Sequence, residues 1–172
     1  MQNLQHLQHP KNWFVLYTRP KYEKKLSLEI GQLNYENYLP LRTTFRKWSD
    51  RVKRIEEPLF PNYLFVRMAA NEKHDILSAE GAVRLVSIQG KPVPVKESEI
   101  AKIRKLESVG KEIILEGLGC AGDKVRVIRG ILAGYEGELL RKPKASRFLI
   151  KLAVLNQGVS VEISDRDVEL IA

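Results

Sequence analysis

The chain has 172 residues, a single cysteine and a formal charge of +8 at pH 7. This length fits one medium domain or two small ones, one cysteine excludes a disulfide framework within the chain, and the basic excess favours an anionic partner, most commonly nucleic acid. The first ten residues lack the apolar core of a signal peptide, and no apolar run approaches the roughly 20 residues that span a bilayer. We therefore expect a soluble cytoplasmic protein that does not associate with membranes.

The N-terminal third begins with a polar, glutamine-rich segment, residues 1–11, which we expect to be a flexible tail. Residues 12–18 are dominated by aromatic and branched side chains, which predicts a strand. Apolar residues then recur at helical spacing from Tyr22 to Leu33, with Pro20 in the first turn of that helix.

The following segment is predicted to contain a hairpin. Residues 35–48 are extended and interrupted by Pro40, residues 49–51 (SDR) form the turn, and a strand runs from Pro61 to Met68. The alternation along this strand places Tyr63, Phe65 and Arg67 on one face and Leu64, Val66 and Met68 on the other. Because both faces carry apolar side chains, either the strand is covered on both sides or one face is an exposed patch for a protein partner.

Two helices and another strand complete the first region. Asn71 is a candidate cap for a short helix ending near Ala79, residues 82–88 read as a strand, and residues 97–110 form a helix that Gly110 ends. Helices and strands thus alternate over residues 12–110. The simplest architecture is an α+β sandwich with helices packed against a sheet.

The composition changes near Glu116. Residues 111–121 are expected to be a linker, and residues 122–172 carry five short runs of strand type separated by turn residues. This pattern predicts a small β-barrel. The glycines at 117, 119 and 122 match GxGxxG, but a strand follows them instead of the helix that a dinucleotide site requires, so a domain junction is the better interpretation.

No set of residues assembles a catalytic or metal site. His6 and His9 lie in the tail without further ligands, His74 has no nearby cysteine, and Asp165 and Asp167 fit a turn better than general acid–base chemistry. We expect a non-enzymatic protein with no metal and no cofactor.

Two basic groups are candidate nucleic-acid sites. Residues 42–54 carry a net charge of +5 around Phe45 and Trp48, so that phosphates could lie along the cations and bases or sugars near the rings. The cations are Arg42, Arg46, Lys47, Arg51, Lys53 and Arg54. The alternative is a solvated hairpin whose charges prevent edge pairing. The second group surrounds the start of the first helix, where the helix N-terminus would add to the attraction for an anion; its members are Arg19, Lys21, Lys24 and Lys25.

Three longer segments resemble a known family. WFVLYTRPKYEKK from residue 13, EEPLFPNYLFVRM from residue 56 and GDKVRVIRGILAGYEGELL from residue 122 occur in this order. Together they resemble the NusG-like transcription elongation factors, and RKWSDR and EPLFPNYLFV look most like the specialised RfaH and UpxY type of operon-specific antiterminators. The resemblance implies a NusG-type N-terminal α/β sandwich over residues 12–110 and a C-terminal KOW domain, an SH3-like small barrel, over residues 122–172.

The resemblance also implies partners and site residues. An apolar pocket on one sheet face would dock on the clamp helices of the large catalytic subunit of RNA polymerase, and His74 lies in the region that reaches the other jaw of the cleft. By position, the pocket would comprise Tyr17, Leu59, Pro61, Tyr63 and Phe65. The basic residues at the first helix would contact the single-stranded non-template DNA.

In this family such bridging suppresses pausing and termination, and the KOW domain contacts a ribosomal protein or a termination factor. We expect the barrel form for residues 122–172, because glycines and β-branched runs disfavour helix there. A general NusG-type elongation factor and a KOW-containing RNA- or ribosome-binding protein remain the alternatives.

Overall fold

The structure is a computed structural model that describes residues 10–117 and 122–171. The chain divides into two compact units. The first combines the described part of Met1–Tyr38 with Asn62–Lys96, and the second combines Leu39–Pro61 with the described part of Glu97–Ala172. The predicted domain boundaries follow the order of the chain, whereas these units do not, so the domain limits stay a prediction.

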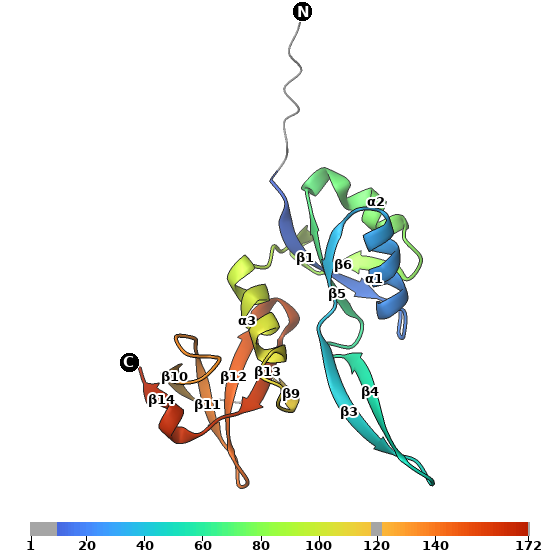
Figure 1. The fold of residues 1–172 in the computed structure, drawn as a ribbon. Helices are drawn as coiled ribbons and strands as arrows, with labels where there is room; N and C mark the ends of the chain where they lie inside the picture. The colour runs from blue at the N-terminus through green and yellow to red at the C-terminus, as the bar shows by residue number, and fades with distance from the viewer. Residues whose placement is uncertain (1–9, 118–121, 172) are drawn as a thin grey trace, which may run out of the picture. The chain divides into compact units, whose positions relative to one another are not determined.

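The first unit is built on an antiparallel sheet with the strand order β2-β5-β1-β6. Its strands are β1 (Asn12–Thr18), β2 (Glu36–Tyr38), β5 (Tyr63–Met68) and β6 (Ala82–Leu85). Its helices are α1 (Glu23–Gln32), the 3-10 turn η1 (Ala70–Glu72) and α2 (Lys73–Ser78), and a small hairpin pairs β7 (Ser87–Ile88) with β8 (Lys91–Pro92). The predicted α+β architecture of this region is confirmed (Figure 1).

One face of this sheet packs against α1. Leu16 of β1 stands opposite Leu64 of β5 in the ladder, and both are fully buried. Asn37 of β2 lies on the same face and bonds to the Ser27 hydroxyl and carbonyl of α1 at 2.6 and 3.1 Å. The Leu64 face is therefore the one toward the helix.

Three local predictions need correction. Pro20 lies in the turn before α1, because the helix begins only at Glu23. The helical turn after β5 is capped not by Asn71 but by the Glu72 carboxylate, which accepts a 2.7 Å bond from the Ala69 N–H. The strand expected over residues 82–88 is interrupted at Val86, whose N–H donates to the Val15 carbonyl. The next two residues form the separate strand β7, which pairs with β8.

The hairpin β3 (Leu41–Lys47) and β4 (Val52–Pro58) is a separate two-stranded sheet, visible in Figure 1 as a long narrow ribbon. The Trp48 N–H donates to the Arg51 carbonyl at 2.8 Å and closes the turn that the SDR segment predicts. Most side chains of both strands are exposed. The hairpin therefore depends on its own ladder and cross-strand pairs along most of its length.

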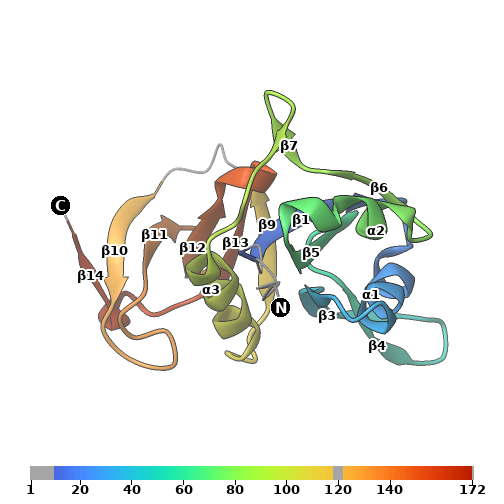
Figure 2. The same cartoon turned by 90° about the horizontal axis from the view of Figure 1, so that it is seen from above.

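The C-terminal region is an antiparallel sheet with the order β14-β10-β11-β12-β13-β9, which Figure 2 shows from above. Its strands are β9 (Ile113–Gly117), β10 (Asp123–Val127), β11 (Glu136–Arg141), β12 (Ser146–Leu152), β13 (Gln157–Glu162) and β14 (Val168–Leu170), with 3-10 turns η2 (Ala153–Leu155) and η3 (Asp165–Asp167). Helix α3 (Glu97–Glu107) precedes it and buries Ile100, Ile103 and Leu106. The β-rich character of this region is confirmed.

Strand β9 contradicts part of the predicted linker. Residues 111–121 were expected to connect two domains, yet Ile113–Gly117 pairs with β13 along the whole strand. Residues 118–121 of the predicted linker lie outside the described residues. The pairing adds a sixth strand to the five that the sequence predicts.

A buried polar network fixes β9 to the sheet. The Glu116 carboxylate accepts from Ser160 Oγ at 2.8 Å and from Lys142 Nζ at 2.6 Å. Arg147 is also buried and donates to Ser160 Oγ at 2.8 Å and to the Glu112 carbonyl at 3.0 Å. Burial acts to raise the pKa of Glu116, but the hydrogen bonds from Lys142 and Ser160 and the charges of Lys142 and Arg147 outweigh it and leave this pKa lowered.

Candidate functional site

A row of three side chains crosses the sheet face opposite α1. The ladders place Tyr63 of β5, Tyr17 of β1 and Arg84 of β6 side by side. The two tyrosine rings meet edge to face with centroids 5.5 Å apart, and the Arg84 guanidinium lies 5.3 Å from the Tyr17 ring. Both tyrosines are half-buried and Arg84 is exposed, so this aromatic row has surface that a partner can contact.

The rest of the predicted pocket is less accessible. Phe65 lies next along the same face, with its ring centroid 6.0 Å from that of Tyr38, and it has 0% exposure. Leu59 is also 0% exposed, while Pro61 is exposed. As direct contact residues, Phe65 and Leu59 are not supported, because neither side chain reaches the surface.

His74 is exposed on α2, within a short helix held by contacts of its neighbours. The Tyr35 hydroxyl donates a 2.8 Å bond to the carboxylate of Asp75. Burial, this hydrogen bond and the charge of Asp75 raise the pKa of Tyr35 to about 12. The structure thus fixes the helix that carries His74, and the role of His74 stays a prediction.

The basic group at the start of α1 is partly neutralised. Lys25 Nζ lies 2.5 Å from the Glu80 carboxylate, and this bond raises the pKa of Lys25 and lowers that of Glu80. The buried Glu23 carboxylate occupies the first turn and accepts from the Asn62 N–H at 2.8 Å. An anion at this helix N-terminus would face that carboxylate, so the expected help from the helix dipole is offset.

The other three cations of this group are exposed, and they are Arg19, Lys21 and Lys24. Lys21 adopts the left-handed backbone conformation with φ of 66°. Their exposure leaves them accessible to a phosphate backbone.

The predicted nucleic-acid-binding residues of the hairpin differ in whether a carboxylate lies within ion-pair distance. Arg42 and Arg46 both contact the Glu57 carboxylate, at 2.8 and 3.6 Å. Arg51 lies 3.9 Å from Asp50, whereas Lys47 has no carboxylate within ion-pair distance among the described residues. The single charge of Glu57 offsets one of these two arginines near the base of the hairpin, and the rest of the positive excess lies toward the turn.

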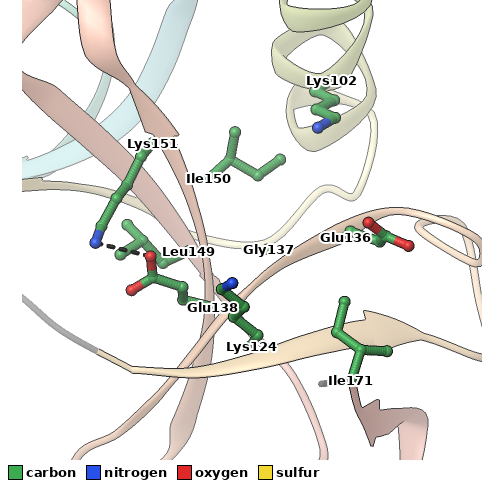
Figure 3. Close-up of a pocket in the computed structure, with 9 residues that line it drawn as sticks. All are labelled: Lys102, Lys124, Glu136, Gly137, Glu138, Leu149, Ile150, Lys151 and Ile171. Atoms are coloured by element: carbon green, nitrogen blue, oxygen red, sulfur yellow. Dashed lines mark ion pairs between the residues drawn. The ribbon is translucent and has the colours of Figure 1, made fainter.

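Two hollows lie within the described part of the second unit. One of about 610 Å³ lies beside the base of the hairpin, where the Thr44 Oγ1 is buried without a hydrogen-bond partner. The other, of about 400 Å³, is lined by α3 and the sheet (Figure 3). There Lys151 pairs with Glu138 at 2.7 Å, and Glu136 pairs with Arg126. Both carboxylates of this hollow are therefore already paired with basic side chains. Neither hollow presents a catalytic arrangement.

Within residues 10–117 and 122–171, no group of three or more His, Cys, Asp or Glu side chains is placed to hold a metal ion. The helices of this same part of the chain are all too short or too polar to cross a bilayer.

Comparison with known proteins decides the family. The family model described as transcription termination factor nusG matches residues 11–104, more than half of the chain. The chain belongs to the NusG family. Transcription termination/antitermination protein NusG of Streptococcus pyogenes serotype M3 is 30% identical over 146 residues, with 76% of this chain and 80% of that protein covered. The NusG of Lactococcus lactis is 26% identical and covers 92% of each chain.

A solved structure has a similar fold. Thermotoga maritima NusG superposes with a TM-score of 0.56 at 23% identity, covering 94% of this chain and 98% of that one. This likeness shows the fold, a NusG-like N-terminal domain followed by a C-terminal β-rich domain. Members of the NusG family are transcription factors and not enzymes.

Sequence reasoning missed Arg84. An arginine in a short strand carries no signal of its own, and only the pairing of β6 with β1 brings it beside Tyr17. The pairing of Arg42 with Glu57 could, in contrast, have been predicted from the sequence. A turn at residues 49–51 places Arg42 opposite Glu57, as the ladder has it.

Proposed function

We propose that this chain is a transcription antitermination and elongation factor that docks on the clamp helices of the large catalytic subunit of RNA polymerase. It bridges the polymerase cleft, with His74 toward the other jaw, and suppresses pausing or termination. NusG family proteins act with RNA polymerase, which supports the partner. The observation that carries the proposal is the accessible row of Tyr63, Tyr17 and Arg84 on the sheet face opposite α1.

The chemistry of the row fits a helical protein surface. Two half-buried tyrosines offer apolar area with polar tips, a combination enriched at protein interfaces. Arg84 contacts an aromatic ring and, among the described residues, no carboxylate lies within ion-pair distance of it. A partner that places an apolar side chain over the tyrosines and a carboxylate near Arg84 would complement the row.

Polymerase affinity of the full chain tests this docking. Tyr63→Ala removes a central anchor and is expected to cost about 2 kcal/mol, roughly a 30-fold rise in Kd. Arg67→Gln is the control, because Arg67 is on the same strand face but already pairs with Glu36 at 3.1 Å. Unchanged affinity of a folded Tyr63→Ala variant, or an equal loss in Arg67→Gln, would reject the assignment.

The operon-specific mode is the finer part of the proposal. Exposed cations at Arg19, Lys21 and Lys24 and at the hairpin turn would contact the single-stranded non-template DNA and recruit the factor to selected operons. Mapping chromosome occupancy of the chain tests it. Occupancy limited to a few operons supports recruitment, and occupancy of most transcribed genes rejects it.

A general NusG-type elongation factor is the second candidate, and the relatives in S. pyogenes and L. lactis are named transcription termination/antitermination protein NusG. The same occupancy map separates the two. In either case we propose that the KOW-like domain contacts a ribosomal protein or a termination factor. We also propose that the protein acts in the cytoplasm.

A further inference from the structure

The turn of the hairpin β3–β4 brings an exposed indole ring and several cations together. Trp48 is 50% exposed at the end of β3. Its ring centroid lies 5.4 Å from Lys53 Nζ and 6.0 Å from the Arg51 guanidinium carbon. The 2.8 Å backbone bond between Trp48 and Arg51 fixes the turn that carries all three groups.

The same end of the hairpin contains an unfavourable pair. Arg46 and Lys53 are directly opposite each other in the ladder, and like charges at opposed positions destabilise a two-stranded sheet. Arg46 shares the Glu57 carboxylate with Arg42, at 3.6 Å, but no carboxylate within the described residues lies at ion-pair distance from Lys53. An isolated hairpin is marginal in stability, so an uncompensated cation here indicates a site for an external anion.

We propose that Trp48 stacks on an unpaired base while Lys53 and Arg51 bind the adjacent backbone phosphate, so that the hairpin turn is a binding site for single-stranded nucleic acid. A single strand presents a flat base joined to a phosphate, the two groups that an exposed indole and nearby cations recognise. A duplex presents phosphates but keeps its bases stacked inside. This inference rests on the nucleic-acid contact proposed above, and not on the polymerase contact.

The chain supplies its own reporter. It contains two tryptophans, and Trp13 is only 2% exposed. Quenching of tryptophan emission by a twelve-nucleotide oligo(dT) would therefore report on Trp48. Oligo(U) of equal length distinguishes DNA from RNA as the ligand, and a twelve-base-pair duplex provides the comparison for phosphate binding alone.

Variants of the full chain separate stacking from charge. Trp48→Ala should abolish the quenching and weaken binding of a labelled oligo(dT), followed by anisotropy, about tenfold or more, the scale of one base–aromatic stack. Trp48→Phe should keep most of the affinity, because it keeps a ring. Lys53→Gln should reduce the slope of log K against log salt by about 0.7. Arg42→Gln is the matched control and should leave that slope unchanged, because Glu57 already neutralises Arg42 at 2.8 Å.

Preference for either single strand over the duplex, with loss of binding in Trp48→Ala, supports the site. Equal or tighter binding of the duplex, quenching that persists in Trp48→Ala, or a Lys53→Gln slope like that of Arg42→Gln would overturn it. Tyr63→Ala should bind oligo(dT) like the unchanged chain. A failure of polymerase docking would therefore leave this result intact, and the reverse also holds.

Discussion

Lys142 Nζ lies 2.6 Å from the buried carboxylate of Glu116, and so joins the turn between β11 and β12 to strand β9. Ser160 donates to the same carboxylate oxygen, Oε1, at 2.8 Å. Without these donors, a carboxylate in this position would be buried without compensation. The network therefore explains how a short strand next to a glycine-rich segment is held in the sheet.

Glu116→Gln should destabilise the chain by about 1–2 kcal/mol at pH 7, because it removes a charge-assisted bond to a partly exposed lysine and weakens the bond from Ser160. The folded pKa of Glu116 is lowered, so its contribution is present above the unfolded pKa and is lost as the pH falls through the folded pKa. Urea unfolding at pH 7 and in the acid range measures both effects. The difference between the two chains should shrink in acid, and a constant difference would contradict the assignment.

The matched control is Glu162→Gln. Glu162 lies on the neighbouring strand β13, but its side chain is exposed. Its replacement should change the free energy of unfolding by less than about 0.5 kcal/mol. A similar loss of unfolding free energy in both variants would mean that the effect of Glu116→Gln comes from net charge rather than from the buried network.

Strand β9 also shows why part of the fold was missed from the sequence. Alternation and turn residues identify β1, β5 and the strands from β10 onward, because each is a local pattern. Residues 113–117 lie beside a run of small residues that reads as a linker, and their partner β13 begins about forty residues later. Pairing over that distance depends on the assembled sheet.

The candidate surface was predictable to a similar extent. Period-two alternation places Tyr63 and Phe65 on one face, and the ladder confirms it. Alternation does not report how much of each side chain is covered, so the full burial of Phe65 could not be inferred. It also gives no cross-strand register, and the contact of Arg84 with Tyr17 depends on that register.

Tyr35 should titrate far above an ordinary tyrosine. Its pKa is raised to about 12 by burial and by the bond to Asp75. Ultraviolet difference titration should show one tyrosine with a high pKa in the unchanged chain, and this titration step should be missing in Tyr35→Phe. Asp75→Asn removes the negative charge and should move this pKa down toward 10. The raised value also implies stability that is complete below about pH 10 and is lost as the pH rises toward the folded value.

Phe65→Ala should destabilise the first unit by about 3–5 kcal/mol, the cost of deleting a buried aromatic side chain. Phe45→Ala is the matched control, because Phe45 is 71% exposed on the hairpin, and its effect should stay within about 0.5 kcal/mol. Thermal and urea unfolding measure both. If Phe65→Ala has the same free energy of unfolding as the unchanged chain, Phe65 is not a core residue. A direct contact of Phe65 with the polymerase would then be open again.

Gly137→Ala should disrupt the packing of β11 on β12. A Cβ at Gly137 would lie 2.5 Å from the Leu149 carbonyl oxygen and 2.6 Å from Cε2 of Phe148, so backbone as well as a buried ring must shift. Gly117→Ala is the matched control, because nothing lies within 4 Å of the corresponding Cβ and its φ is not positive. We expect a loss of about 1–3 kcal/mol for the first variant and no loss for the second, measured by urea unfolding. Equal stability of the two variants would mean that β11 and β12 are farther apart at this point than the ladder requires.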